Sequence, residues 1–189
     1  MPPSDFAIRQ TDTQCGLFAS SKALLRYGVP FTYIENCKVT DVTFTKGFKD
    51  FISVASVVKA FQNMRIGQIS VRPKPFLSTM VNEGELLEKF GIEVIPINTV
   101  MFKKFYDHVK DKKAEEIKIL AEDIKSKARC IETSNEQLHT IAALELTFKE
   151  LADEFELSAL ASECWMTFYN ILGIRPCFVF GDVTDRWFP

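Results

Sequence analysis

The sequence lacks several short patterns that identify common functional sites. Its 189 residues include five cysteines but no C-x-x-C pair, and its two histidines, His108 and His139, have no companion at metal-ligand spacing. We therefore expect no zinc site, free thiols packed mostly as small apolar side chains, and a structural or surface role for both histidines. No G-x-G-x-x-G, G-x-x-x-x-G-K-[ST] or G-x-S-x-G occurs, so neither a nucleotide-binding glycine loop nor a serine nucleophile elbow is predicted.

The chain also lacks an excess of charge and a long apolar run. Its formal net charge is −2, which gives no basic footprint for nucleic acid. No apolar run approaches the roughly 20 residues of a membrane span. Residues 1–5 (Met-Pro-Pro-Ser-Asp) lack the basic start and apolar stretch of a signal peptide. These absences predict a cytoplasmic protein with neither nucleic acid nor membrane as its partner.

What the chain does contain is a large apolar content arranged in alternating patterns. Hydrophobic residues make up 47% of the sequence and include 17 phenylalanines. This content is enough for a real core and for apolar faces of the chain that pack against neighbouring domains or subunits. Apolar periodicity predicts helices over residues 15–27, 45–64, 83–90, 102–127, 135–155 and 165–172, and strands over 31–35, 66–71, 92–97, 158–162 and 176–180. The alternation predicts one α/β domain over residues 1–189, with an open, mostly parallel, Rossmann- or flavodoxin-like sheet and helices on both faces.

The candidate functional residues follow the predicted strands. Ligands of such sheets bind beyond the carboxyl ends of the strands, where Glu163 stands. A carboxylate there could hold a hard divalent cation or act as a base, or could be an ordinary loop residue or helix cap. Arg72 could bind a sugar hydroxyl or phosphate, or be a surface or interdomain charge. Asp182 and Asp185, after the last predicted strand, could be functional or could be turn residues. Cys164 has no base near it in sequence, which argues against a thiol nucleophile.

Three groups of segments resemble the fucose isomerase-like group of L-fucose/D-arabinose sugar isomerases. The first is residues 15–30, from Cys-Gly-Leu-Phe to Gly-Val-Pro, and the second is 64–73 followed by 85–92. The third is Glu163-Cys164-Trp165 with Pro176-Cys177 and the Gly-Asp-Val-Thr-Asp of residues 181–185. The resemblance implies that the chain is the second, middle α/β domain of a three-domain enzyme, with the N- and C-terminal domains missing.

The same resemblance implies an aldose–ketose isomerase of carbohydrate metabolism that works through an enediol on a pentose or 6-deoxyhexose. It implies Mn²⁺ held by two carboxylates and a histidine, with Glu163 as one metal ligand and as a catalytic acid/base. Arg72 is expected to contact substrate or another domain. The other ligands are expected beyond Pro189, so the isolated chain is expected to be inactive and its parent to be a homo-oligomer. The alternative is a small-molecule-binding or interaction module with a flavodoxin-like or periplasmic-binding-like fold and no catalysis.

Overall fold

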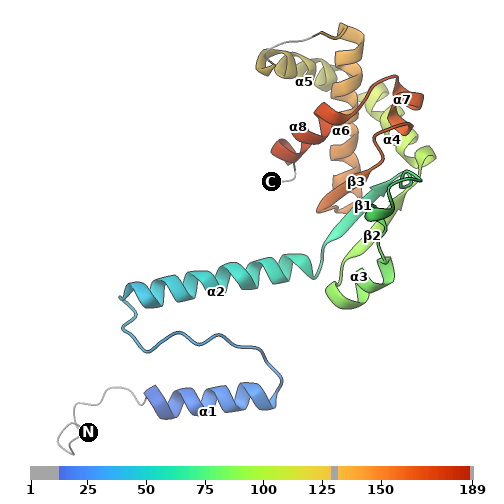
Figure 1. The fold of residues 1–189 in the computed structure, drawn as a ribbon. Coiled ribbons are helices and arrows are strands. Elements are labelled where there is room, and N and C mark those ends of the chain that lie inside the picture. The colour runs from blue at the N-terminus through green and yellow to red at the C-terminus, as the bar shows by residue number, and fades with distance from the viewer. Residues whose placement is uncertain (1–12, 129–131, 188–189) are drawn as a thin grey trace, which may run out of the picture. The chain divides into compact units, whose positions relative to one another are not determined.

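The structure, a computed structural model, describes residues 13–128 and 132–187 (Figure 1). The chain divides into two compact units, Met1–Lys59 and Ala60–Pro189. The single domain predicted over residues 1–189 stays a prediction. The alternation of strands and helices that predicted the fold class lies within the second unit.

The described residues of the first unit form the helix α1 (Thr13–Arg26) and most of α2 (Val42–Phe61), which extends two residues beyond Lys59. The first of these ends as predicted, because Gly28 adopts a φ of +65° and the amide of Val29 donates to the carbonyl oxygen of Leu24 at 2.9 Å. The strand predicted over residues 31–35 is absent, and this segment is irregular backbone. It packs on α2 through Ile34, whose side-chain atoms lie 3.0–3.2 Å from where a Cβ of Gly47 would stand.

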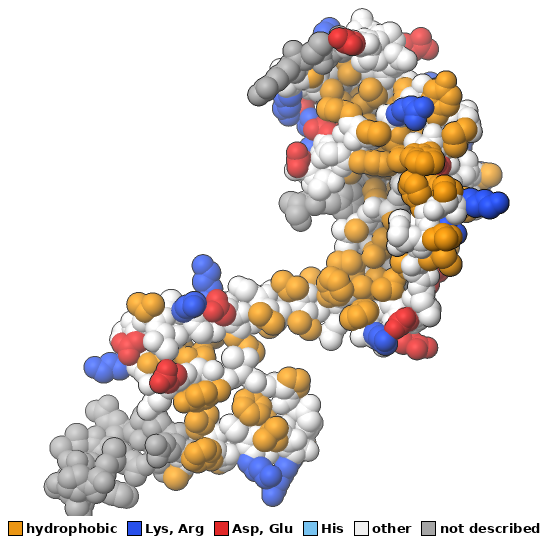
Figure 2. Space-filling model, in the orientation of Figure 1, with side chains coloured by type: hydrophobic (Ala, Val, Ile, Leu, Met, Phe, Trp, Pro, Cys, Tyr) orange, Lys and Arg blue, Asp and Glu red, His pale blue; other side chains and the backbone are white. Residues whose placement is uncertain are grey.

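Apolar side chains of the first unit remain exposed. No residue of α2 is buried. Figure 2 shows hydrophobic side chains along both helices of this unit, and the most exposed of the large ones are Phe18, Leu25, Tyr27, Val39, Val42, Val54 and Val57. The described residues of this unit therefore do not form a core of their own, which agrees with the expectation that the chain carries apolar faces for other parts of a larger protein.

The second unit is built on a three-stranded parallel sheet of β1 (Arg65–Ile69), β2 (Glu93–Ile97) and β3 (Ala159–Ser162). The strand order is β2-β1-β3, and Ile66 of the central strand pairs with Val94 on one side and with Ala159 on the other. The predicted α/β class with a parallel sheet is thereby confirmed.

The remaining helices are α3 (Glu83–Phe90), α4 (Thr99–Lys112), α5 (Ala114–Lys127), α6 (Asn135–Phe155), α7 (Thr167–Leu172) and α8 (Cys177–Trp187), with a 3₁₀ turn at Leu77–Thr79. The bounds of α3 and α6 agree with the prediction because both helices carry clear caps. Asn82 accepts a hydrogen bond from the amide of Glu85, and Ser134 forms a capping box with Gln137.

The strand predicted over residues 176–180 is wrong, because this segment opens helix α8. A short apolar run such as Cys-Phe-Val-Phe fits a buried strand and a buried helix equally well. Pro176 precedes the first residue of α8, a position where the fixed φ of proline suits the start of a helix. Asp182 and Asp185 consequently lie within α8, and the predicted turn at the edge of the sheet does not exist.

The core lies between one face of the sheet and the long helix α6. Ile69 and Ile97 point into it, together with Phe102 of α4. Seven consecutive residues of α6, 142–148, are buried, so neighbours surround this part of the helix on all sides. Alternate residues Ile66 and Val94 face away from this core, toward Leu86 of α3. Helices therefore lie on both faces of the sheet, as predicted (Figure 1).

Across the described residues, no helix combines the length and the apolar character needed to cross a membrane.

Candidate functional site

The candidate site is a crevice at the carboxyl ends of β1 and β3. After the central strand β1 the chain goes to β2 on one side of it. After β2 the chain crosses to β3 on the other side of β1, so the connections diverge at this edge. In open α/β sheets this divergence leaves an opening in which ligands bind. The crevice has a volume of about 450 Å³. Its lining includes residues that follow β1 (Ser70, Val71, Arg72, Pro73, Phe76), residues at the end of β3 (Ser162, Glu163, Cys164), and apolar side chains of the sheet and α3.

Two residues predicted from the sequence, Glu163 and Arg72, both line this crevice. Glu163 lies one residue beyond β3, and its amide reaches the carbonyl oxygen of Ile69 in β1 at 3.4 Å. Both residues therefore lie at the carboxyl edge of the sheet. Their chemical roles remain predictions.

The carboxylate of Glu163 accepts hydrogen bonds from backbone amides of the turn that follows it and of the first residue of α7. Its Oε1 accepts hydrogen bonds from the amides of Trp165 and Met166, and its Oε2 accepts one from the amide of Thr167, each at 2.8 Å. These amides have no partner within a helix, so an acidic side chain here satisfies them and complements the helix dipole. The helix-cap reading of Glu163 thus describes its contacts directly.

The environment of Glu163 keeps its carboxylate ionised. Burial on its own raises the pKa of Glu163, but hydrogen bonds from the side chain of Thr167 and from the amides of residues 165–167 outweigh it and hold the pKa below the usual value. An efficient proton shuttle at neutral pH needs a pKa near neutrality. The carboxylate is therefore best suited to accept hydrogen bonds as an anion.

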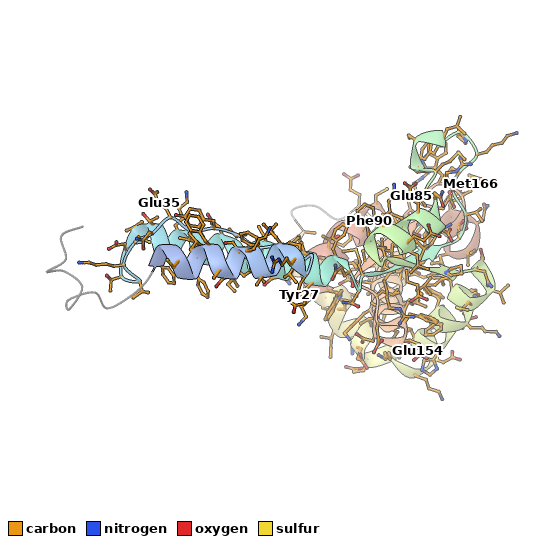
Figure 3. The ribbon with its side chains drawn as sticks, turned by 90° about the horizontal axis from the view of Figure 1, so that it is seen from below. Tyr27, Glu35, Glu85, Phe90, Glu154 and Met166 are labelled. Atoms are coloured by element: carbon orange, nitrogen blue, oxygen red, sulfur yellow. The ribbon has the colours of Figure 1, made fainter. Side chains whose placement is uncertain are left out.

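We expect Glu163→Ala to lower the free energy of unfolding by about 1–2 kcal/mol, because three amides lose their acceptor. The loss should shrink as the pH falls below 4.5, the ordinary value, because a carboxylate with a lowered pKa stabilises the folded state only while it is ionised. Urea unfolding followed by circular dichroism at pH 7 and pH 3.5 measures both effects. Glu154→Ala is the control, since Glu154 is exposed (labelled in Figure 3). Equal losses for the two variants at pH 7 would contradict the capping role.

Arg72 is held within its own loop. Its Nη1 donates to the carbonyl oxygens of Pro73 at 3.0 Å and of Lys74 at 3.1 Å. These contacts fix the loop after β1 and occupy one end of the guanidinium. The other nitrogens of Arg72 have no hydrogen bond or ion pair within the described residues.

Two serines and a threonine of this site escaped the sequence analysis. Ser70 adopts a φ of +67°, uncommon for a residue other than glycine, and its Oγ lies 3.0 Å from Oγ1 of Thr167. Ser162 Oγ is buried and has no hydrogen-bond partner among the described residues. Ser70 and Ser162 stand at the ends of predicted strands, the same signal that singled out Glu163. Ser162 lines the crevice as a residue, but its Oγ has almost no accessible surface there.

The described residues do not by themselves make a Mn²⁺ site. No group of three His, Cys, Asp or Glu side chains in residues 13–128 and 132–187 is placed to hold a metal. Both oxygens of Glu163 already accept hydrogen bonds from amides. The metal-ligand role of Glu163 stays a prediction, and it requires ligands from outside the described residues.

The other residues considered from the sequence lie apart from the crevice, except for Cys164. His108 and His139 are exposed on α4 and α6, as the surface interpretation predicted. Cys164 lines the crevice and is half-buried, as is Cys37, whereas Cys15 and Cys177 are exposed. The thiols of these four residues are free, as predicted, but none is fully packed away. Cys130 lies outside the described residues.

A second group of charges, on α5, α6 and α8, also escaped the sequence analysis. Glu145 is fully buried in α6, with its Oε1 3.1 Å from Nε of Arg186. Arg186 also pairs with Asp182 at 2.7 Å and with Asp123 at 2.6 Å. Burial and the neighbouring Asp182 carboxylate raise the pKa of Glu145 to about 7. Because Glu145 lies between two leucines in a long helix, the apolar pattern did not reveal it.

The buried Glu145 should make the stability of the second unit fall as the pH rises. Between 4.5 and about 7 the folded state keeps a proton that the unfolded state has lost, so stability decreases across this range. We expect Glu145→Gln to remove this dependence. The stability of the wild type relative to the variant should decrease from pH 5 to 7.5, with a slope of at most about 1.4 kcal/mol per pH unit. Urea unfolding across this range tests it, with Glu154→Gln on the same helix as the control. Parallel curves for wild type and Glu145→Gln would contradict it.

Comparisons with known proteins bear on both units. A family model described as the N-terminal domain of fucose/sulfoquinovose isomerases matches residues 3–62. Sulfoquinovose isomerases of Priestia aryabhattai and Priestia megaterium are each 28% identical to this chain over 134 residues, and that of Alkalicoccus urumqiensis is 27% identical over 133 residues. The alignments cover 70–71% of this chain but only 29% of each relative.

The extent of these matches agrees with the division of the chain. The family model ends at residue 62, close to the boundary between Lys59 and Ala60. That model describes an N-terminal domain, whereas the resemblance drawn from the sequence implies a middle domain. The assignment of the chain to a middle domain stays a prediction. These matches confirm the resemblance to the fucose isomerase-like sugar isomerases that was drawn from the sequence.

Proposed function

We propose that this chain is part of an aldose–ketose isomerase in which the crevice at the ends of β1 and β3 forms one wall of the sugar site. The observation that carries this proposal is the coincidence of two findings in one chain. The sequence is related to sugar isomerases, and the second unit opens a crevice with convergent polar groups at the edge of the sheet where α/β proteins bind ligands.

We further propose how the chain divides between the domains of such an enzyme. Residues up to about 60 would complete an N-terminal domain, and the residues from Ala60 would begin the next α/β domain. The exposed apolar side chains of α1 and α2 support this division, because they need cover that the described residues of the first unit do not supply. The isolated chain would then be inactive, since it spans 29% of its relatives.

The substrate class proposed from the sequence is a pentose or 6-deoxyhexose, and the names of the relatives add sulfoquinovose. Interconversion of an aldose and a ketose moves a proton between C1 and C2 through an enediol, which requires a base and polarisation of the carbonyl and hydroxyl oxygens. Within this chain, Glu163 lines the crevice and offers an anionic acceptor for a sugar hydroxyl. Mn²⁺ dependence is retained as a proposal, with the missing ligands coming from other segments.

The test uses the longest reading frame that contains this chain. Proton NMR in D₂O follows conversion of L-fucose, D-arabinose and sulfoquinovose, since an enediol mechanism brings solvent deuterium onto the sugar. We expect isomerisation and deuterium incorporation that are lost after dialysis against EDTA and restored by Mn²⁺. We also expect Glu163→Gln to lower kcat/KM by about 10-fold to 100-fold, because one charged acceptor in the site is lost.

Two results would contradict these proposals. Absence of conversion for all three sugars, in a folded protein supplied with Mn²⁺, would favour the alternative of a binding module without catalysis. Full activity in EDTA would remove the metal requirement and leave the isomerase in place. Glu154→Gln is the matched control and should retain wild-type kcat/KM, because the exposed Glu154 lies on α6 and does not line the crevice.

A further inference from the structure

The charged groups shared by α5, α6 and α8 leave one carboxyl group without a hydrogen bond. Glu145 of α6 is fully buried, and neither of its oxygens has a hydrogen-bond partner among the described residues. Nε of Arg186 lies 3.1 Å from Oε1 of Glu145, but it donates its hydrogen bond to Oδ2 of Asp182 at 2.7 Å. Nη2 of Arg186 donates to Oδ2 of Asp123 at 2.6 Å. The guanidinium thus bonds with two other carboxylates and leaves Glu145 without one.

The other charged groups around Glu145 are engaged in contacts of their own. Asp123 of α5 accepts hydrogen bonds from Lys127 and from the guanidinium, and these bonds hold its pKa below the usual value, so it stays ionised. Lys149, on the same helix as Glu145, is paired with Asp153 at 2.5 Å. An ionised Glu145 would therefore be a third carboxylate around one guanidinium, in a position that water does not reach.

The burial of Glu145 and its ionisation therefore oppose each other. A carboxylate removed from water without a hydrogen-bond partner is strongly unfavourable, so the buried group keeps its proton. The same burial, together with the neighbouring Asp182, raises the pKa of Glu145 to about 7 from the ordinary 4.5. The groups that enclose Glu145 include two side chains of α8, Asp182 and Arg186. Detachment of α8 would let water reach the carboxyl group and would let it ionise.

The contacts of α8 allow it to detach while the sheet stays folded. The helix packs on α6 and α7 through Val179, Phe180 and Val183 (Figure 1). The pairing of β1 with β2 and with β3 involves no residue of α8. At the end of α7, Gly173 has no atom within 4 Å of where a Cβ would stand, so the connection to α8 has room to move.

We propose that α8 is a latch on α6 that opens without unfolding of the sheet, and that it opens more often as the pH rises because Glu145 cannot ionise while α8 covers it. Between pH 4.5 and about 7 the closed form keeps a proton that the open form releases. Opening therefore becomes up to about tenfold more frequent with each pH unit and levels off above about pH 7. An open latch uncovers the apolar side of α6 that carries Phe148, which packs against Phe180 when the latch is closed.

Native-state hydrogen exchange of the full chain tests the latch. Exchange of the α8 and α6 amides is followed at pH 5, 6, 7 and 8 in low concentrations of urea, and each rate is divided by the intrinsic rate for that pH. We expect the α8 amides to exchange through an opening that is more frequent and less dependent on urea than the opening of α6, because a local opening exposes less surface. The frequency of the α8 opening should rise about 10-fold to 40-fold from pH 5 to pH 7.

Three variants identify the group responsible. Glu145→Gln should abolish the rise with pH, because the amide does not ionise. Asp182→Asn should reduce the rise, because it removes a neighbouring carboxylate and frees Nε of Arg186 to pair with an ionised Glu145. Glu154→Gln, an exposed position on the same helix, should behave as the wild type.

Two results would overturn the latch. Equal frequencies and equal urea dependence for the α8 and α6 amides would show that α8 opens only when the whole unit unfolds. An equal rise with pH in the wild type and in Glu145→Gln would show that another group controls the opening. If Glu145→Gln does not fold, Asp182→Asn decides the second point, since a rise as large as that of the wild type contradicts the role of Glu145.

Discussion

Replacing Phe148 with alanine is expected to lower the free energy of unfolding of the second unit by about 3–5 kcal/mol. Phe148 lies on α6 with 1% of its surface exposed. Its ring centroid is 6.3 Å from that of Phe102 on α4, 5.8 Å from that of Phe168 on α7 and 5.9 Å from that of Phe180 on α8. Truncation therefore opens a cavity at the point where four helices meet and removes three aromatic contacts.

Tryptophan fluorescence during urea unfolding measures this loss in the unit concerned, because Trp165 and Trp187 both belong to it. Phe178→Ala is the matched control, a phenylalanine on α8 that is 48% exposed. Phe178→Ala should lower the free energy of unfolding by no more than about 1 kcal/mol, because the substitution leaves no cavity. If Phe148→Ala were no more destabilising than Phe178→Ala, the aromatic cluster would not be the centre of the core.

Replacing Gly91 with alanine is expected to lower the free energy of unfolding by about 3 kcal/mol or more, an unusually large effect for the addition of one methyl group. Gly91 ends α3 with a φ of +69°, and its amide donates to the carbonyl oxygens of Leu86 and Leu87. A Cβ added there would lie 2.3 Å from the carbonyl oxygen of Gln62, which is backbone and cannot rotate away. The turn would have to move, and with it the start of β2 beside it.

Two other glycines separate the causes of this effect. Gly173 has a similar φ of +71° but nothing within 4 Å of its added Cβ, so Gly173→Ala measures the backbone strain alone, about 1–2 kcal/mol. Gly84 lies in the first turn of α3 with its nearest neighbour at 3.5 Å, and Gly84→Ala should be neutral or stabilising. Urea unfolding of the three variants should rank Gly91 well above Gly173, and equal losses at these two positions would show that the clash is relieved.

The elements that could be predicted from the sequence are those whose ends carry local signals. Asn82 and Gly91 mark α3, and Ser134 marks α6, and both helices begin and end where predicted. The run at 176–180 was misassigned because four residues of apolar sequence contain no period that separates a strand from a helix. The split between α4 and α5 at Lys113 was also missed, because helix-forming residues continue through it.

The candidate site could be predicted only as far as strand ends allow. The sequence places Glu163 and Arg72 just after strands, and the parallel sheet brings them to one crevice. The three amides bound by Glu163 depend on how the chain turns into α7, and the contact between Phe76 and Trp165 joins residues far apart in sequence. Such tertiary contacts leave no periodic pattern in the sequence. The burial of Glu145 leaves none either, because it depends on the packing of α8 on α6.

The order of strands in the sheet also fixes the order in which the domain can assemble. β1 is synthesised first, yet it lies at the centre, and its partner Ala159 leaves the ribosome only after α3 to α6 have been made. Until then one edge of β1 has no strand to pair with, and pairings between such distant segments form slowly. A nascent chain that ends before residue 159 therefore exposes an open strand edge, the feature that chaperones protect and that leads to aggregation.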